Sequence, residues 1–135
     1  MNSEPLQSLV GDRIKRSTYD KESGSWLIHF RSGSTLNIEC MWRLLEEGSI
    51  TLTSYDHDQI FGRETPLNGE EELNKMEAHE ILSIDLKEET GDISLNFGSC
   101  FTLQILSTSA GYEAWQFNEY NGQSIVAVSG QFHAY

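Results

Sequence analysis

The sequence predicts an α+β domain that is mostly antiparallel β and is built from one helix-plus-meander unit used twice. Three observations lead to this fold class: an internal repeat, apolar residues that alternate along short segments, and turn residues between those segments. The chain has 135 residues, enough for one domain with a shared core, whereas each half alone would be marginal. We therefore expect a single domain over residues 1–135.

The repeat is clearest between residues 30–38 and 97–105, where Phe, Thr, Leu and Ile recur at a constant offset of 67. The offset grows to 73 between Trp42 and Trp115 and to 75 between residues 49–54 and 124–129. The extra residues fall between matched blocks, where loops tolerate insertions. The sequence therefore predicts two repeats, at about 4–54 and 71–129, joined by a loop at 55–70.

The first repeat is expected to begin with a short helix. Residues 3–5 (Ser-Glu-Pro) suit a capped first turn, Leu6 and Leu9 give the helix one apolar side, and Gly11 ends it. Alternating polar and apolar residues, separated by turns at 21–24, 32–33 and 46–48, then predict strands. These strands are expected at 13–19, 26–30, 35–44 and 49–54. The segment 35–44 is predicted to be one continuous strand with Leu36, Ile38, Cys40 and Trp42 on one face.

The second repeat follows a polar loop and is expected to begin with a helix capped by Asn68. Three glutamates at 70–72 lie at the positive end of this helix, and Leu73 and Met76 give its apolar side. Strands are then expected at 81–86, 92–97, 101–106, 112–117 and 124–129. Because glycine stands three places after Phe30 but one place after Phe97, the two hairpin loops are expected to differ in turn type.

Strands of this pattern have one apolar face, and two such sheets can bury these faces against each other. We expect either a sandwich or a barrel-like two-sheet domain, with the helices at its edges. Eight residues are predicted to form the core: Phe30, Leu36, Ile38, Trp42, Phe97, Leu103, Ile105 and Trp115.

The net charge of −12 is concentrated in the middle of the chain. Residues 46–92 hold 14 acidic and three basic residues, a net charge of −11. This distribution argues against binding to nucleic acid or to an anionic membrane surface, because both need basic patches. It can steer a basic protein towards the chain, or it can simply keep the chain in solution.

Several features indicate a cytoplasmic protein. There is no apolar run long enough to span a membrane, and the first residues lack the basic and apolar regions of a secretory signal. The two cysteines, Cys40 and Cys100, do not belong to a C-x-x-C pair and do not occupy equivalent repeat positions. We expect them to be free thiols in a reducing compartment.

No motif carries a strong catalytic meaning. The sequence has no P-loop, no G-x-G-x-x-G, no G-x-S-x-G and no H-E-x-x-H. The densest titratable cluster is Asp56-His57-Asp58, which could supply a base or metal ligands. Neighbouring residues in an extended chain point in opposite directions, so the plainer interpretation is a polar loop. We expect no enzymatic activity, no metal and no cofactor.

A second cluster lies on the predicted strand 112–117. Glu113 and Trp115 share a face of this strand, next to Tyr112, and Trp115 is the repeat partner of Trp42. One interpretation is a core tryptophan with an edge carboxylate paired to Arg43 or Arg31. The other is the floor of a pocket or an interface built from aromatic and acidic groups.

The pattern Phe30-x-x-Gly33-x-x-Leu36-x-Ile38, the pair Trp42-Arg43 and the later Tyr112-Glu113-x-Trp115 resemble small bacterial domains. Some of these domains are immunity proteins of contact-dependent and polymorphic toxin systems. The resemblance spans most of the chain, its motifs are structural, and it implies no catalytic residues.

This resemblance, together with the acidity, favours a non-enzymatic protein-binding module, an immunity-like inhibitor of a basic toxin. The acidic side chains expected to contact a basic partner are Asp56, Asp58, Glu70, Glu71 and Glu72, along with Glu77 and Glu80. An alternative is a protein with a small-molecule pocket at the seam between the repeats. A third hypothesis is an enzyme that uses Glu113 or the Asp56-His57-Asp58 loop.

Overall fold

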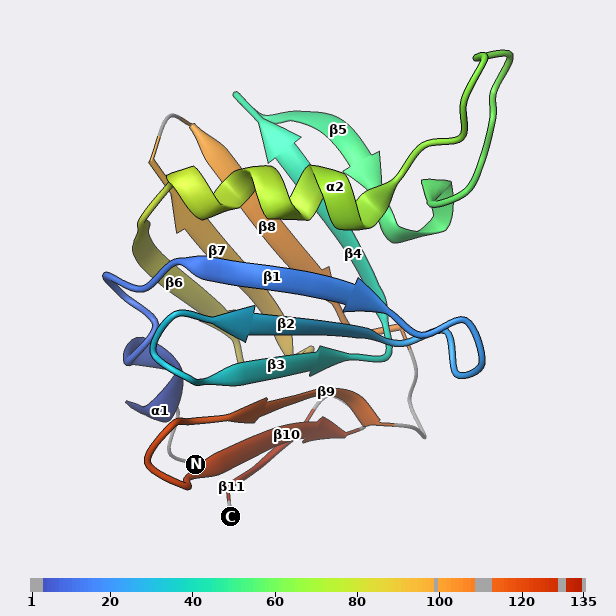
Figure 1. Ribbon diagram of the computed structural model, residues 1–135. Helices are drawn as coiled ribbons and strands as arrows, with labels where there is room; N and C mark the ends of the chain where they lie inside the picture. Colours follow the sequence, from blue (N-terminus) through green and yellow to red (C-terminus); the bar gives the residue numbers. More distant parts are fainter. Residues whose placement is uncertain (1–3, 99, 109–112, 129–130, 135) are drawn as a thin grey trace.

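Two antiparallel sheets make up most of the chain in a computed structural model that describes residues 4–98, 100–108, 113–128 and 131–134 (Figure 1). Sheet A has the strand order β1-β2-β3-β9-β10-β11, and sheet B has the order β5-β4-β8-β7-β6. The mostly antiparallel β fold predicted from the sequence is therefore present. No helix in these described ranges is long and apolar enough to cross a membrane.

The elements follow the predicted order except that the expected strand 35–44 is two strands and that a further strand, β11, follows β10. The first part contains α1 (Glu4–Gln7), β1 (Ile14–Tyr19), β2 (Trp26–Phe30), β3 (Thr35–Ile38), β4 (Met41–Glu46), β5 (Ser49–Thr53) and the 3₁₀ turn η1 (Ser54–Asp56). The second part contains α2 (Gly69–Asn74), the 3₁₀ turn η2 (Lys75–Ala78), β6 (Ile81–Lys87), β7 (Asp92–Phe97), β8 (Phe101–Leu106), β9 (Glu113–Asn118), β10 (Ser124–Val128) and β11 (Gln131–Ala134).

The expected strand 35–44 is wrong, because the chain changes sheets in the middle of it. β3 pairs with β9 in sheet A, whereas β4 pairs with β8 in sheet B, and residues 39–40 cross between them. The crossing lets Ile38 and Trp42 reach the same core from opposite sheets. Cys40 therefore lies at the crossing, half-buried, and not on a strand face. The predicted five-strand meander is interrupted at the same place.

The strands are thus exchanged between the sheets. The first three strands of each half form one sheet, and the next two strands join the sheet of the other half. The two sheets carry matching pairs: Ile14 lies opposite Phe30 as Ile81 lies opposite Phe97, and a bulge follows in both hairpins. Likewise Ile38 lies opposite Trp115 in sheet A, and Ile105 lies opposite Trp42 in sheet B.

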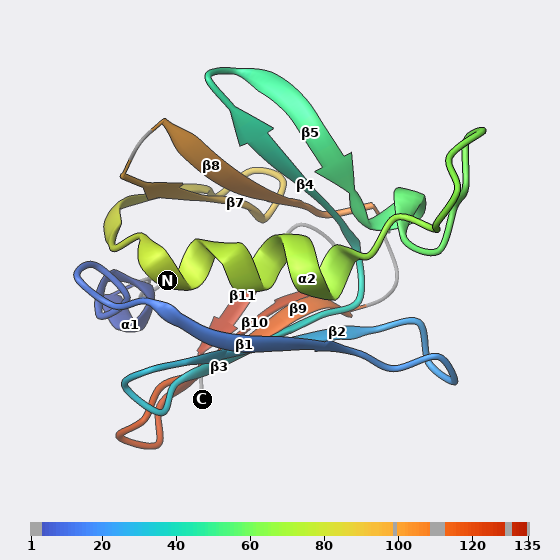
Figure 2. The same cartoon turned by 45° about the horizontal axis from the view of Figure 1, so that its top comes forward.

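The core lies between the two sheets, and all eight residues predicted for it are buried. Its largest side chains are Trp26, Trp42, Trp115, Phe30 and Phe117, each at most 2% exposed. Figure 2 shows α2 lying between the two sheets on their open side. Leu73 and Met76 are buried there, as the apolar spacing of this helix predicted.

Two predicted helix signals are confirmed. The side chain of Asn68 caps α2 by accepting a hydrogen bond from the backbone N–H of Glu71. Gly11, which follows the first helix, has a φ of +90°.

The hairpin loops after β2 and β7 share one backbone feature. Gly33 has a φ of +100°, and Cys100, which lies 67 residues later, has a φ of +66°. Both loops therefore enter the left-handed region at the same relative position, although glycine occupies it in only one of them. The predicted difference in turn type stays a prediction, because residue 99 of the second loop lies outside the described residues.

Candidate functional site

The surface differs between the two sheets in a way that the core does not. On the outer face of sheet B, Asp85, Ser94, Gln104 and Arg43 lie side by side on four neighbouring strands. The guanidinium of Arg43 donates a hydrogen bond from Nε to Oε1 of Gln104 at 2.6 Å. The next row is also linked, because Asn96 donates from Nδ2 to Ser83 and to Asp85, each at 2.9 Å.

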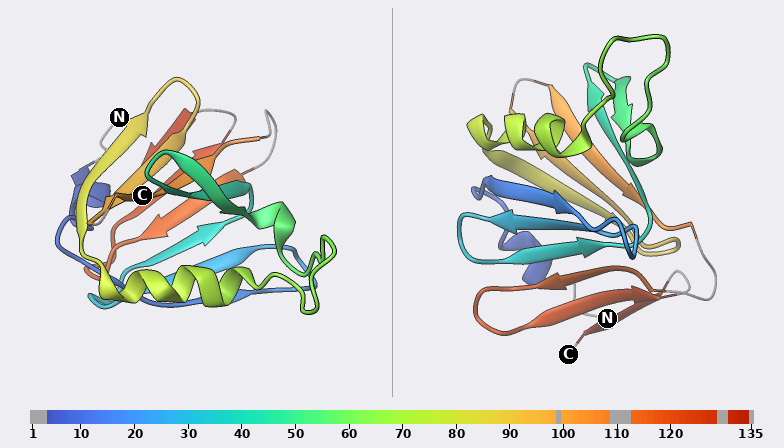
Figure 3. Two further views of the ribbon diagram at one scale, coloured as in Figure 1. Left: turned by 90° about the horizontal axis from the view of Figure 1, so that it is seen from above. Right: turned by 45° about the vertical axis from the view of Figure 1, so that its right-hand side comes forward.

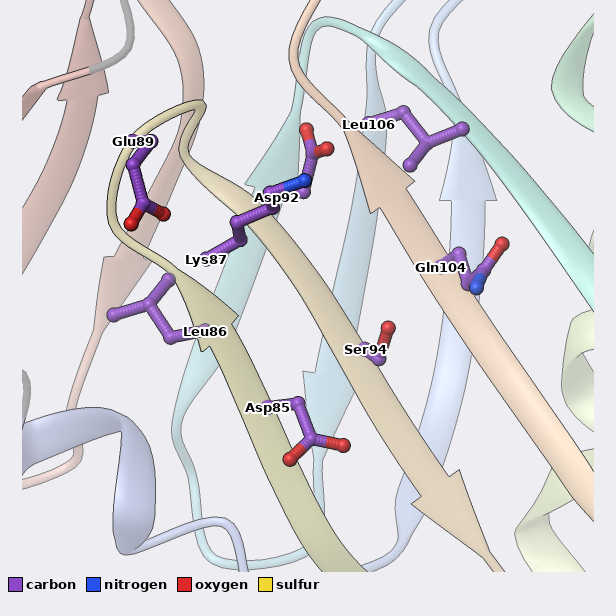
Figure 4. A pocket seen from close by; sticks show the side chains of 8 residues that line it. All are labelled: Asp85, Leu86, Lys87, Glu89, Asp92, Ser94, Gln104 and Leu106. Atoms are coloured by element: carbon purple, nitrogen blue, oxygen red, sulfur yellow. The ribbon is translucent and has the colours of Figure 1, made fainter.

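A shallow groove of about 370 Å³ lies on this face (Figure 4). Its walls come from β6, the following turn, β7 and β8, and its lining residues are Asp85, Leu86, Lys87, Glu89, Asp92, Ser94, Gln104 and Leu106. Three carboxylates and one ammonium group line it. The matching row on the outer face of sheet A consists of Thr18, Leu27, Asn37 and Gln116. The row on sheet B therefore has a charged residue at each end, Asp85 and Arg43, whereas the matching row on sheet A has none.

The cluster Asp56-His57-Asp58 has structural roles that the sequence did not reveal. Asp56 accepts a hydrogen bond from the backbone N–H of Thr53 at 2.9 Å and so closes the turn η1. His57 accepts one at Nδ1 from the backbone N–H of Gly69, also at 2.9 Å. Its Nε2 lies 3.5 Å from Oδ2 of Asp58. Because Nδ1 is an acceptor, the neutral imidazole carries its proton on Nε2, facing Asp58.

The plainer interpretation from the sequence placed His57 in a solvated polar loop. In the structure His57 instead belongs to a buried aromatic cluster. Its side chain is 8% exposed, and its ring lies 4.7 Å from that of Tyr19 and 4.9 Å from that of Trp26. Trp26 in turn meets Trp42 edge to face at 5.0 Å. The start of the loop is therefore fixed to the core, which leaves His57 with a structural function.

From this base the chain projects away from both sheets, as the green loop in Figure 3 shows. Two backbone hydrogen bonds of 2.8 Å hold its two arms together, from Asp58 N–H to Leu67 and from Leu67 N–H to Gln59. At the tip, Arg63 N–H donates to the carbonyl of Ile60 at 2.9 Å. The two residues between them, Phe61 and Gly62, have φ values of +46° and +77°.

This tip has the arrangement of a type I′ turn, which favours Asn-Gly at its centre. A phenylalanine with a positive φ is a backbone outlier, and such strain tends to persist where a function requires it. The side chain of Phe61 is 67% exposed and that of Ile60 is 51% exposed. Neither residue was predicted from the sequence to belong to a site. The available signal was a pair of large apolar residues before Gly62 in a polar loop.

The exposed large apolar side chains are unevenly distributed over the described residues. Four of the seven lie between residues 50 and 61: Ile50, Tyr55, Ile60 and Phe61. The other three, Val10, Leu82 and Tyr120, are far apart in the sequence. We refer to residues 49–68, which comprise β5, η1 and the loop, as the projecting segment.

The acidic residues of α2 only partly form the predicted surface. Glu70 accepts a hydrogen bond at Oε2 from the backbone N–H of Tyr19, so its carboxylate is bound to the edge of β1. Glu72 pairs with Lys75 at 2.8 Å, and this hydrogen bond raises the pKa of the lysine. Glu77 lies 3.7 Å from Arg31. Of the three glutamates at the start of α2, Glu71 is the exposed one.

The cluster around Glu113 is also rearranged. Trp115 is buried, and its indole N–H donates to the carbonyl of Gly91 at 2.7 Å, while Trp42 is buried in the matching position of sheet B. Glu113 is half-buried, and the expected pairing with Arg43 or Arg31 is wrong, since these arginines contact Gln104 and Glu77. Tyr112 lies outside the described residues.

A small pocket of about 240 Å³ lies where the chain crosses between the sheets. It is lined by Tyr19, Gly24, Trp26, Glu39, Cys40, Ser54, Tyr55 and Thr108. This volume is below the roughly 300–1,000 Å³ of typical small-molecule sites. Burial, followed by the charge of Asp92, raises the pKa of Cys40 to about 12, so its thiol stays protonated at neutral pH and is a poor nucleophile.

Within the described ranges, no three His, Cys, Asp or Glu side chains converge to hold a metal ion. Comparisons of the chain with protein-family models, curated proteins and solved structures found no match.

Proposed function

We propose that this protein is a non-enzymatic binding module that recognises a partner protein through the projecting segment. The partner is a basic protein, and the resemblance of the sequence to immunity proteins favours a toxin whose active site the module covers. The observation that carries this proposal is that four of the seven large apolar side chains exposed among the described residues, Ile50, Tyr55, Ile60 and Phe61, fall within the projecting segment.

Aromatic side chains are enriched among the residues that anchor protein interfaces, and exposed apolar patches mark such interfaces. On the projecting segment they are also held in place before binding. The contacts of His57 with Tyr19 and Trp26 fix the base, and the hydrogen bonds across the arms fix the loop. A preorganised loop loses less conformational entropy on binding, so more of the contact energy appears as affinity.

The charges around these anchors favour a basic partner. Asp58, Glu64 and Glu71 are exposed close to them in sequence, and Arg63 is the exposed base among them. Charges at the rim of an interface mainly raise the association rate, and salt weakens their effect. The anchors supply contact area and the carboxylates supply orientation.

The matching registers of the two sheets support a further part of this proposal, an internal duplication of the ancestral chain. Residues 4–54 and 71–129 are the two copies, and the shared core is made by exchange of their last two strands. In an experimental structure the two copies should overlay with Phe30 on Phe97 and Trp42 on Trp115. An overlay that places these pairs on unrelated strands would rule the duplication out.

Affinity capture from the native host tests the binding function. The full-length chain serves as bait beside two variants, Phe61→Asn in the projecting segment and Leu82→Asn on β6, where the apolar side chain is similarly exposed. We expect a basic protein to be captured by the wild type and by Leu82→Asn, and to be depleted about tenfold with Phe61→Asn, the loss of one interface anchor. Equal capture by all three baits argues against the proposal.

A further inference from the structure

We infer that the free edge of β5 pairs with an extended, lysine- or arginine-bearing segment of the partner, and that one cationic side chain of this segment enters a pocket beneath α2. This inference rests on the proposed binding function and adds how the partner is held. Three observations support it: a partly open strand edge, a matching edge that the chain itself covers, and a pocket with a suitable lining.

β5 is the outermost strand of sheet B (Figure 1). Its residues, Ser-Ile-Thr-Leu-Thr, include neither a charge nor a proline, and Ile50 is 56% exposed. Proteins commonly protect such edges with lysine, proline or a covering element, because a free edge accepts other strands. The strand has two partial protections, a bulge at Thr51 and, at its last residue, a hydrogen bond from the backbone N–H of Thr53 to Oδ2 of Asp56 at 2.9 Å. Neither of them covers Ser49 or Ile50.

The other edges that the structure describes with side chains are protected. At β1, the side chains of α2 take the place of a neighbouring strand: Oδ1 of Asn74 accepts from Ser17 N–H at 2.8 Å, and Glu70 accepts from Tyr19 N–H at 3.1 Å. At β6, the first residue bonds to Gly11 and Asp12, and Asp85 and Lys87 add charges further along the strand. The open edge of β5 is therefore an exception.

In sheet A, the strand that corresponds to β5 is β10, and its outer edge is covered by a further strand of the same chain. β10 pairs with β9 as β5 pairs with β4, since Ile125 lies opposite Phe117 and Leu52 opposite Leu44. In this register Leu52 corresponds to Ile125, an offset of 73, so the offset of 75 predicted for this block is wrong. β11 then adds one more antiparallel strand beside β10, from Ile125 opposite Ala134 to Val128 opposite Gln131. After β5 the chain instead leaves through η1 and the projecting loop. No strand of the described residues lies on the free side of β5, which leaves this place open to a strand from another molecule.

A pocket of about 210 Å³ adjoins β5 between sheet B and the underside of α2 and η2. It is lined by Leu44, Glu46, Thr51, Glu72, Lys75, Met76, His79 and Phe101. Met76 and Phe101 provide an apolar wall for the stem of a long side chain. Glu46 is exposed and makes no ion pair in the described part of the chain, whereas Glu72 is already paired with Lys75. The pocket thus retains one unpaired carboxylate for a lysine or arginine.

Alternation brings such a side chain to the pocket, because every second residue of a strand beside β5 points to the face of sheet B that carries α2. The charges also decide between possible occupants. A second copy of this chain, with a net charge of −12, would bring like charges against Glu46 and Glu47. A basic extended segment is therefore the occupant that the edge favours.

Nuclear magnetic resonance of the ¹⁵N-labelled full-length chain tests this inference. The probe is a blocked hexapeptide in which lysine and threonine alternate. We expect shifts at the amides of Ser49–Thr53 and slowed hydrogen exchange at those of them that do not already donate to β4 or to Asp56, and neither change at β6. A peptide with N-methyl groups on alternate residues and a peptide with glutamate in place of lysine are expected not to bind.

The substitution Glu46→Gln should weaken peptide binding about two- to fivefold, as expected for one exposed ion pair. Glu88→Gln, an exposed carboxylate in the turn before β7, is the matched control and should leave binding unchanged. Absent shifts, shifts at β6 or equal binding of the N-methylated peptide would overturn the inference.

These results can be separated from those of the capture experiment. If the hexapeptide leaves β5 unchanged while Phe61→Asn abolishes capture, strand addition is wrong and the binding function stands. If the hexapeptide binds β5 while the Phe61→Asn bait captures as much partner as the wild type, strand addition stands and the proposed role of the loop is wrong.

Discussion

The segments that follow β5 and β10 start from matching strands and then differ completely. After β10 the chain turns back and adds β11 to sheet A. After β5 it forms η1 and a loop that carries Ile60 and Phe61 away from the sheets. The outer faces differ as well, since Arg43 and Asp85 stand in sheet B where sheet A has Gln116 and Thr18. The core is therefore similar in both halves, and the distinctive chemistry lies where the halves diverge.

The largest expected change in stability comes from the two matching tryptophans of the core, Trp115 and Trp42, and tests how alike the two halves of the core are. Trp115→Ala should lower the free energy of unfolding by about 3–5 kcal/mol, because a large buried side chain is lost. Trp42→Ala should cost about 1 kcal/mol less, since the buried indole N–H of Trp42 makes no hydrogen bond in the described part of the chain, whereas that of Trp115 donates to Gly91. Urea unfolding measures both values.

A loss below about 1 kcal/mol for Trp115→Ala, with an unchanged denaturant slope, would contradict the burial of this residue. A larger loss for Trp42→Ala than for Trp115→Ala would contradict the hydrogen-bonding difference between the two halves.

The next effect concerns the junction between the projecting segment and the core. A Cβ at Gly69 would lie 2.6 Å from the buried ring of Trp26, so the ring or the helix must move. Gly69→Ala should therefore destabilise the protein by about 1–3 kcal/mol. Gly98→Ala is the matched control, because its Cβ meets no atom within 4 Å and should change stability by less than about 0.5 kcal/mol. Equal melting temperatures for the two variants would contradict the packing at Gly69.

The smallest effect on stability has the opposite sign. Phe61→Asn places Asn-Gly at the centre of the tip turn, which tolerates positive φ better than phenylalanine does. We expect a gain of about 1 kcal/mol from released strain. Thermal unfolding measures this gain, and a loss of stability would show that Phe61 makes folded-state contacts that its exposure does not reveal.

The sequence predicted the fold where local signals decided it. Alternation placed Trp26, Ile28 and Phe30 on a buried face, and Asn68 marked the start of α2. It did not predict the crossing at residues 39–40, because the choice of sheet depends on pairing with β8 and β9, which lie far along the chain. β11 was not predicted at all.

The candidate site was predicted less well. The sequence indicated a loop with Asp56, His57 and Asp58, but their roles depend on tertiary contacts. His57 is held by Tyr19 and Trp26, whose rings approach it only in the folded chain. The exposure and backbone strain of Phe61 likewise follow from the three-dimensional course of the loop.

Hydrogen exchange of the free chain and of its complex with the captured partner tests the central claim most directly. The compared regions are the projecting segment, residues 49–68, and the matching part of the other half, residues 119–128. We predict slower exchange in the complex at 49–68, including the amides of Phe61 and Gly62, and unchanged exchange at 119–128. Protection confined to 119–128, or equal in the two regions, would contradict the claim that the partner binds where the halves diverge.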